Sequence, residues 1–289
     1  MTVLSEGYTL PNGVEIPKLG LGTWMIRDDD VAEAVRAAVA MGYRHVDTAQ
    51  AYGNEAGVGE AVRACGVPRE AVFVTTKLAA EAKSYDEAAR AIDGSLKTLG
   101  LDVIDLMIIH SPQPWRRFGG DDRFFEGNRA AWRALEAAYK TGKLRAVGVS
   151  NFERVDLDNL LGACEVAPMV NQVLAHISNT PSALIDYAHE RGMLVEAYSP
   201  IAHGELMKNE TVAAMAARYG VSVPRLSIRY CLQLGLLPLP KTANPEHMRS
   251  NADVDFVISD EDMETLKTLP RIKDYGDASA MPVFGGRMS

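Results

Sequence analysis

The stretch GYRHVDTAQAYGNE, residues 42–55, begins like a buried strand and ends like the start of a helix. Asp47 and Tyr52 stand where the apolar residues give way to polar ones. A strand followed by a helix is the repeating unit of parallel α/β proteins, in which polar side chains after the strands build the functional site. If the unit recurs, Asp47 and Tyr52 lie at the functional edge of such a fold.

The same unit recurs along the whole sequence. Apolar runs with the length and composition of strands occupy residues 18–24, 43–49, 71–78, 103–110, 145–151, 168–174, 193–200 and 236–242. Stretches with helical periodicity lie between them, for example at 29–42, 84–100, 127–143 and 180–192. In one of these, Ser84 and Glu87 have the spacing of a capping box. Near-continuous apolar strands joined by helices predict parallel pairing with the helices outside.

Eight such units in 289 residues favour a closed (β/α)8 TIM barrel of the α/β class, formed as a single domain over residues 1–289. The alternative is an open doubly wound sheet, but GLGTWM at 20–25 lacks the full GxGxxG turn of that fold. Asn12-Gly13 stands between two extended runs at 8–17, which predicts a type I′ β-hairpin capping one end of the barrel. The tail 271–289 is rich in glycine and small polar residues and predicts a long loop over the site.

Composition and charge exclude several classes of partner. A formal charge of −8 without a basic run argues against nucleic acid. Cys65, Cys164 and Cys231 are odd in number and lack CxxC spacing, so we expect neither a disulfide framework nor a metal site. The sequence lacks a signal segment and a long apolar run, which predicts a cytoplasmic protein with no membrane partner. We also expect a monomer.

Polar residues end several of the predicted strands: Asp47, Lys77, His110, Ser150, Asn151 and Lys241. In a barrel these ends meet at one face and carry the chemistry. A buried Lys77 requires a carboxylate, because burial disfavours the charged ammonium, and Asp47 on the neighbouring strand is the natural partner. Two other interpretations stay open at this point. The pair could be purely structural, or Lys77 could form a Schiff base as in an aldolase, which would require a lowered pKa.

The stretch GYRHVDTAQAYGNEAGVG at 42–59 resembles the first signature of the aldo-keto reductase family. The resemblance continues in family order through GLGTW, FVTTKL, DLMIIH, GVSNF, VNQV, AYSPI and LPKTANPEHMRSN. It implies a (β/α)8 barrel with a hairpin at its base, and reduction of a small-molecule carbonyl by a nicotinamide dinucleotide, usually NADPH. The chain looks most like the bacterial branch that includes 2,5-diketo-gluconate reductases. A non-catalytic NADPH-binding regulatory module is the alternative within the family.

The resemblance implies a catalytic tetrad of Asp47, Tyr52, Lys77 and His110. Tyr52 would protonate the carbonyl oxygen as a hydride adds to the carbon. A free phenol has a pKa of about 10, so we expect the ammonium of Lys77 to favour the phenolate. Asp47 would keep Lys77 charged and oriented, while His110 would hydrogen-bond the carbonyl. All four residue types are present, which argues against the regulatory module.

The resemblance also implies a cofactor site. Ser150, Asn151 and Gln172 match the residues that hold the nicotinamide carboxamide, and Tyr198 matches the aromatic residue that stacks on the ring. The loop 199–205 would wrap the pyrophosphate through backbone N–H groups. The remaining expected cofactor residues are Thr23, Asp47, Ser199, Ile201, Lys241, Thr242, His247 and Asn251.

One departure from the family pattern concerns the choice between NADPH and NADH. Lys241 and Thr242 match the residues that meet a 2′-phosphate, but His247 stands where the family generally has arginine. Histidine lacks the permanent charge and the planar fork of arginine. Arg249 lies about 200° around the same short helix and is a poor substitute. We therefore expect NADPH, with some use of NADH.

A second departure concerns the expected substrate pocket of Trp24, Tyr52, His110 and Ser111. Many relatives carry tryptophan where this chain has Ser111, so the pocket is expected to admit bulkier or more polar carbonyl compounds. Trp115 is either a replacement wall or a solvent-facing loop residue.

Overall fold

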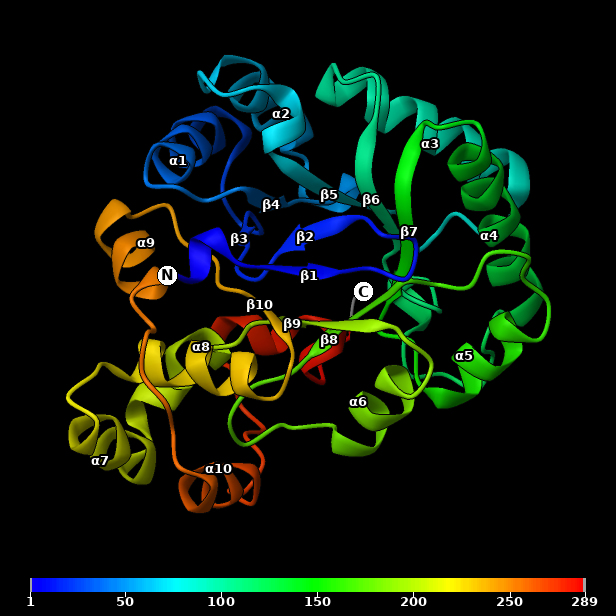
Figure 1. Ribbon diagram of the computed structural model, residues 1–289. Coiled ribbons are helices and arrows are strands. Elements are labelled where there is room, and N and C mark those ends of the chain that lie inside the picture. The colour runs from blue at the N-terminus through cyan, green and yellow to red at the C-terminus, as the bar shows by residue number, and fades with distance from the viewer. Residues whose placement is uncertain (1, 288–289) are drawn as a thin grey trace.

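The computed structural model describes residues 2–287, which form a (β/α)8 barrel (Figure 1). In that part of the chain the barrel strands are β3 (Leu21–Gly22), β4 (His45–Asp47), β5 (Phe73–Leu78), β6 (Ile104–Ile109), β7 (Leu144–Ser150), β8 (Val170–Leu174), β9 (Leu194–Tyr198) and β10 (Leu237–Leu239). Each pairs in parallel with its neighbours in chain order. Every predicted apolar run overlaps one strand, so the predicted fold class is confirmed.

The barrel closes between its first and last strands. The N–H of Gly20 donates to the carbonyl of Pro238 at 3.2 Å, and the N–H of Gly22 donates to that of Pro240 at 3.1 Å. A Cβ on Gly20 would lie 2.5 Å from Cδ2 of Leu239, so glycine permits this close approach. These contacts exclude the open doubly wound sheet.

The helices surround the barrel (Figure 1). They are α1 (Asp28–Ala40), α2 (Glu55–Ala64), α3 (Tyr85–Leu99), α4 (Phe125–Lys140), α5 (Arg154–Leu161), α6 (Ser182–His189), α7 (Glu210–Arg218), α8 (Val223–Gln233), α9 (Pro245–Ala252) and α10 (Asp260–Lys267). Helix α1 buries Val31, Val35 and Val39, whose spacing of four residues keeps them on one face. The predicted cap of α3 is confirmed, because the hydroxyl of Ser84 accepts from the N–H of Glu87 at 3.3 Å.

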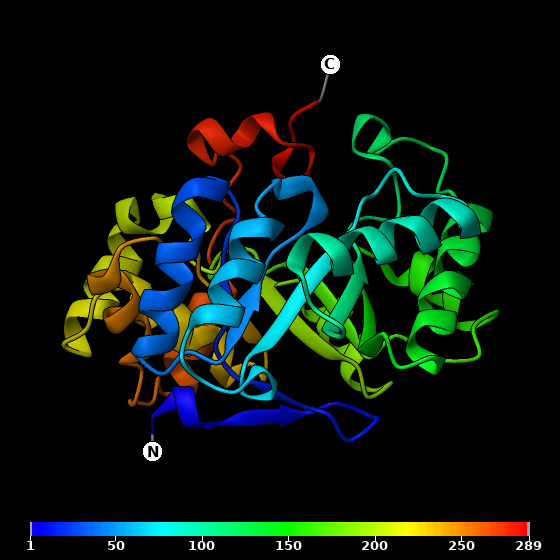
Figure 2. The ribbon, with the colours of Figure 1, turned by 90° about the horizontal axis from the view of Figure 1, so that it is seen from above.

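The predicted hairpin is confirmed, and its strands β1 (Gly7–Thr9) and β2 (Glu15–Pro17) cross the base of the barrel (Figures 1 and 2). The predicted turn type is wrong. Leu10 and Val14 close a three-residue loop, with a bond of 2.8 Å from the N–H of Leu10 to the carbonyl of Val14. Gly13 has φ +83°, whereas Asn12 keeps a negative φ. A type I′ turn would need Pro11 at a paired strand position, where its missing N–H is unfavourable.

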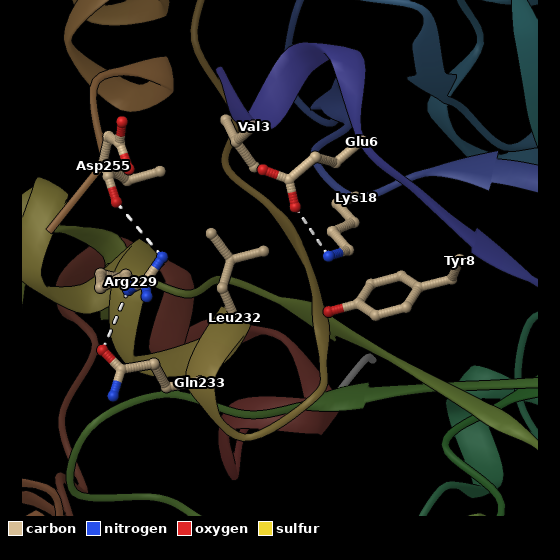
Figure 3. A pocket seen from close by; sticks show the side chains of 9 residues that line it. Val3, Glu6, Tyr8, Lys18, Arg229, Leu232, Gln233 and Asp255 are labelled. Carbon is tan, nitrogen blue, oxygen red and sulfur yellow. Dashed lines mark hydrogen bonds and ion pairs between the residues drawn. The ribbon is translucent and has the colours of Figure 1, made fainter. Parts of the chain in front are cut away.

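Polar side chains of the hairpin segment and of α8 face each other at the base. Figure 3 shows Glu6, Tyr8 and Lys18 facing Arg229 and Gln233 across a hollow of about 280 Å³. Lys18 pairs with Glu6 at 2.8 Å, and Nε of Arg229 donates to Oε1 of Gln233 at 2.9 Å. The hydroxyl of Tyr8 donates to the carbonyl of Leu236, just before β10, at 3.2 Å. The bond from Tyr8 therefore attaches the hairpin to the base of the barrel, whereas the other two bonds order the facing side chains.

The C-terminal loop lies at the opposite end of the barrel from the hairpin (Figure 2). It contains two short 3₁₀ helices, η6 (Gly276–Ala280) and η7 (Pro282–Phe284). Phe284 lies near Tyr198 at the end of β9, with 6.4 Å between ring centroids, so the loop covers the strand ends as predicted. Met288 and Ser289, the last residues of the predicted tail, lie outside the described residues. Across residues 2–287, every helix falls short of the length and apolarity needed to cross a membrane.

Candidate active site

A cavity of about 640 Å³ opens at the C-terminal ends of the barrel strands. Most of the residues predicted for the site line it: Trp24, Asp47, Tyr52, His110, Ser150, Asn151, Gln172, Tyr198, Ser199, Ile201, Lys241, Thr242, His247 and Asn251. The C-terminal loop completes the wall with Met281, Pro282, Val283 and Phe284. One continuous cavity therefore joins the predicted catalytic end to the predicted adenosine end.

Lys77 forms the centre of the buried polar cluster. Its Nζ lies 2.6 Å from Oδ2 of Asp47, 2.8 Å from the carbonyl oxygen of Thr48 and 3.2 Å from the hydroxyl of Tyr52. Asp47 ends β4 and Lys77 is the last residue but one of the neighbouring β5, while Tyr52 ends the short 3₁₀ helix η2 (Gln50–Tyr52) that follows β4. The stretch 42–55 thus brings Asp47 and Tyr52 to the same ammonium group.

The contacts of Lys77 determine its charge. Burial by itself would lower the pKa of the Lys77 ammonium, but its neighbours outweigh burial, Asp47 through its charge and hydrogen bond and Tyr52 through its hydroxyl, and the pKa is raised above 10.5. Lys77 is therefore a charged ammonium at neutral pH. A Schiff-base lysine needs the opposite shift, so the aldolase interpretation loses its support.

The Tyr52 phenol differs from the sequence-based expectation. Burial raises the pKa of Tyr52 above 10, the charge of Lys77 lowers it, and Asp47 raises it again, so that the net direction is upward. The expected effect of Lys77 is present, but burial outweighs it. Tyr52 consequently holds its proton at neutral pH, which is the state that a proton donor requires.

His110 is a neutral imidazole beside Tyr52. Burial, with a smaller contribution from the charge of Lys77, lowers the pKa of His110 well below 6.5. The rings of His110 and Tyr52 meet edge to face with 5.7 Å between centroids. Nδ1 of His110 is buried and lacks a hydrogen-bond partner within residues 2–287. The ring thus borders the cavity without a charge of its own.

Trp115 lines the cavity, which favours the first of its two sequence-based interpretations, a replacement wall. It belongs to η4 (Trp115–Arg117), lines the cavity and meets the His110 ring at 5.0 Å between centroids. Ser111, in contrast, is fully buried behind the wall, and its hydroxyl accepts from the N–H of Gln113 at 3.2 Å. The expectation that Ser111 lines the pocket differs from this geometry, because Ser111 is enclosed by protein and does not reach the cavity.

The polar residues after β7 connect the cavity to His110. Nδ2 of Asn151 donates to the carbonyl of His110 at 3.0 Å, and the hydroxyl of Tyr198 donates to Oδ1 of Asn151 at 2.7 Å. Asn151 takes φ +60°, a conformation that asparagine tolerates better than most residues. Thr23 was expected at this site but is fully buried, and its hydroxyl donates to the carbonyl of Asp47 at 2.9 Å. Thr23 therefore supports Asp47 from outside the cavity.

Gln172 joins two carboxyl groups. Its Nε2 donates to Oδ1 of Asp47 at 2.9 Å and to Oε2 of Glu196 at 2.7 Å. Glu196 lies in the middle of β9 and is fully buried. Sequence reasoning missed this residue, although an acidic side chain inside the apolar strand LVEAY was a usable signal.

The far end of the cavity is built by the segment after β10. Lys241 and Thr242 follow the strand, and Asn244 caps α9 by accepting from the N–H of Glu246 at 2.8 Å. His247 and Asn251 lie four residues apart and share the helix face that lines the cavity. Arg249 is exposed on the other side of α9, as its position around the helix predicted.

The loop after β9 also contributes residues that sequence reasoning missed. It continues into η5 (Ala202–Lys208), where Ala202 and His203 have φ values of +49° and +54°. The His203 ring lies 5.4 Å from that of Trp24 and 4.8 Å from that of Phe284, centroid to centroid. Gly204, also at positive φ, was the signal for an irregular loop. The described residues hold no cluster of three histidine, cysteine or acidic side chains that could bind a metal ion.

Comparison with known proteins finds relatives of this chain both by sequence and by structure. The profile of the Aldo/keto reductase family matches residues 18–270. A glyoxal reductase of Bacillus subtilis is 39% identical over 277 residues, which cover 95% of this chain and 96% of the relative. An aldo-keto reductase from a Medee basin deep-sea metagenome library has a TM-score of 0.84 at 38% identity, covering 91% and 94% of the two chains. An aldo-keto reductase of Bombyx mori in complex with NADP has a TM-score of 0.84 at 31% identity, covering 95% of each chain.

Proposed function

The chain belongs to the aldo/keto reductase family, and from that premise we propose that it reduces an aldehyde or ketone with NADPH and uses Tyr52 as the proton donor. The observation that carries the proposal is the contact of 3.2 Å between Nζ of Lys77 and the hydroxyl of Tyr52, with Asp47 on the other side of the ammonium. A solely structural ion pair would not require a phenol at the cavity wall.

The residues around the cavity fit a nicotinamide dinucleotide. Gln172, Asn151 and Ser150 offer amide and hydroxyl groups at one end, beside the aromatic ring of Tyr198. Lys241 offers a cation at the other end, where a 2′-phosphate would bind, and His247 and Asn251 would face the adenine. When bound, NADPH supplies the hydride for the carbonyl carbon. NADH is expected to serve less well, since it lacks the phosphate that Lys241 would meet.

Each member of the polar cluster has a defined part in the proposed reaction. Tyr52 donates its proton to the carbonyl oxygen as negative charge develops there. Lys77 stabilises the resulting phenolate through its charge, and Asp47 keeps the ammonium in place. His110 borders the same space as a neutral ring and would orient the carbonyl by a hydrogen bond.

Because Trp115 supplies a ring to the wall, the space near Tyr52 favours a small, largely apolar carbonyl compound and not the bulkier or more polar compounds expected from Ser111. Trp24, Trp115 and Phe284 surround the space with aromatic surface. We further propose that residues 1–289 act as one domain. The monomeric state and the cytoplasmic location stay predictions from the sequence.

Tyr52→Phe tests the proposed proton donor. Oxidation of NADPH is followed by absorbance with a panel of aldehydes, ketones and ketoses. The variant should lose about 10²-fold or more in kcat, because the general acid is absent. Tyr85→Phe, which changes an exposed tyrosine at the start of α3, is the matched control and should behave as wild type. Activity of the Tyr52 variant within about tenfold of wild type would remove Tyr52 as the acid.

A further inference from the structure

Glu196 is a buried acid that the proposed reaction does not use. Its side chain points into the barrel from β9, and its accessible surface is 0%. Oε2 accepts from Gln172, whereas Oε1 lacks a hydrogen-bond partner within residues 2–287. A buried carboxyl with an unpartnered oxygen is unfavourable for folding. Its retention next to a site residue therefore points to a role in the site.

The bonds of Gln172 show what Glu196 does to the amide. The atom of Gln172 that faces both carboxyl groups must be the nitrogen, because the carboxylate of Asp47 can only accept. That nitrogen has two hydrogens, and Asp47 and Glu196 take one each. The amide oxygen is then the atom left for a ligand, and Gln172 lines the cavity. With Glu196 in place, Gln172 offers the cavity an acceptor rather than a donor.

We propose that Glu196 is a positioning residue of the cofactor site, which would hold the Gln172 amide oxygen toward the carboxamide of a nicotinamide and, when it ionises, adds a negative charge beside Gln172. The inference rests on the proposed function, because it assumes a nicotinamide dinucleotide in the cavity. It goes beyond the residues that the family resemblance implies, among which Glu196 does not occur.

The surroundings of Glu196 set the pH at which that charge appears. The groups that face it are Gln172 on β8, Asp47 on β4 and Lys77 on β5, and its register neighbour on β10 is the apolar Leu237. Burial first, and the charge of Asp47 second, raise the pKa of Glu196 to about 8 against the opposing effects of Gln172 and Lys77. Below that pH Glu196 is neutral, and the positive charge of Lys77 balances the negative charge of Asp47.

Ionisation of Glu196 should discriminate between the two redox states of the cofactor. The oxidised nicotinamide ring carries a positive charge and the reduced ring is neutral, so a nearby carboxylate favours the oxidised form. Affinity for NADP⁺ relative to NADPH should therefore rise as the pH passes through about 8. Titration of the 2′-phosphate affects both forms alike and cancels in the ratio.

Equilibrium binding tests the inference without turnover. Dissociation constants for NADPH and NADP⁺ are measured from tryptophan fluorescence, since Trp24 and Trp115 line the cavity. In wild type, the ratio of Kd for NADP⁺ to Kd for NADPH should fall by about tenfold between pH ~6.5 and pH ~9.5. Glu196→Gln keeps an acceptor for Gln172 and should bind NADPH within about threefold of wild type, but with a ratio that no longer depends on pH.

Further variants separate positioning from a general effect on the fold. Glu196→Leu removes the acceptor and should weaken NADPH binding by about tenfold, the order expected for a hydrogen bond near charged groups. In a protein that already carries Gln172→Met, Glu196→Leu should weaken NADPH binding little further, because Glu196 acts through Gln172. Glu55→Gln alters a buried acid in α2 outside the cavity wall and should keep the pH-dependent ratio.

The possible results have distinct meanings. If wild type binds neither nucleotide, the proposed function fails together with the inference. If wild type binds both but Glu196→Gln retains the pH-dependent ratio and Glu196→Leu binds normally, only the inference is overturned. Should Glu196→Leu fail to fold, the pH dependence of Glu196→Gln decides the question alone.

Discussion

At the scale of single residues, Lys77 shows how a charged side chain can end an apolar strand. An ammonium has three hydrogens, and Asp47, Thr48 and Tyr52 provide an acceptor for each. A buried charge without such partners would be strongly unfavourable. The bond between Lys77 and Tyr52 therefore has two effects. It places a cation beside the proposed proton donor, and it gives the buried ammonium one of the acceptors that it needs.

His247→Arg tests cofactor selection at the same scale. His247 lines the adenosine end of the cavity from α9, and arginine would bring a permanent charge and a planar fork to a 2′-phosphate. The ratio of kcat/KM with NADPH to kcat/KM with NADH should rise by about tenfold, as one charge-assisted contact allows. Arg249→Ala, on the exposed side of the same helix, should leave this ratio unchanged. A strong NADH preference in wild type would show that Lys241 does not govern selection.

At the scale of elements, the barrel closes where the backbone just before β3 comes close to side chains of β4 and β10. Gly20 precedes β3, and a Cβ there would lie 2.5 Å from Cδ2 of Leu239 and 2.8 Å from Nδ1 of His45. Both neighbours are buried, so neither can move into solvent. Any larger residue at this position would therefore force these two buried side chains to shift.

Gly20→Ala should lower the free energy of unfolding by roughly 1–3 kcal/mol, because the core has no space for the added methyl group. Gly94→Ala is the matched control. Gly94 is exposed in the middle of α3, and a Cβ there meets nothing within 4 Å. That change should raise the free energy of unfolding by about 0.5–1 kcal/mol, since alanine favours helix. Urea denaturation measures both, and equal effects would show that barrel closure is not tight at Gly20.

At the scale of the whole molecule, the cavity is covered by segments that are far apart in the sequence. Phe284 lies 6.3 Å from Trp24, 4.8 Å from His203 and 4.7 Å from Tyr275, centroid to centroid. The aromatic cover thus joins the loop after β3, the loop after β9 and the C-terminal loop. We expect it to enclose the substrate and to exclude water during the reaction.

Phe284→Ala tests this cover. Loss of the ring removes apolar surface from the wall, so KM for an apolar aldehyde should rise by about tenfold with kcat little changed. Arg287→Ala, three residues later at an exposed position, is the control and should keep the wild-type KM. An unchanged KM in the Phe284 variant would show that the C-terminal loop does not contact the substrate.

Much of this architecture was predictable because it depends on local patterns. Apolar runs alternating with amphipathic stretches specify strands and helices, and the strand ends bring Asp47 and Lys77 together once the pairing is parallel. Helix geometry likewise predicted that Arg249 lies on another side of α9 from His247. Reasoning from local patterns failed at Asn12-Gly13, where the effect of Pro11 on strand pairing determined the turn.

By itself, the sequence determined the barrel, its hairpin and the polar groups at the strand ends, since periodicity and spacing encode which element a residue occupies, while the resemblance to the family supplied the role of Tyr52. Only the tertiary structure decided that Trp115 and not Ser111 forms the wall, that Glu196 holds Gln172, and that burial outweighs Lys77 at the Tyr52 phenol. These outcomes depend on side-chain orientation, on solvent exclusion and on contacts such as that between Gln172 and Asp47, which are 125 residues apart. Spacing along the chain does not encode such distances, because they are set when all the strands close on one another.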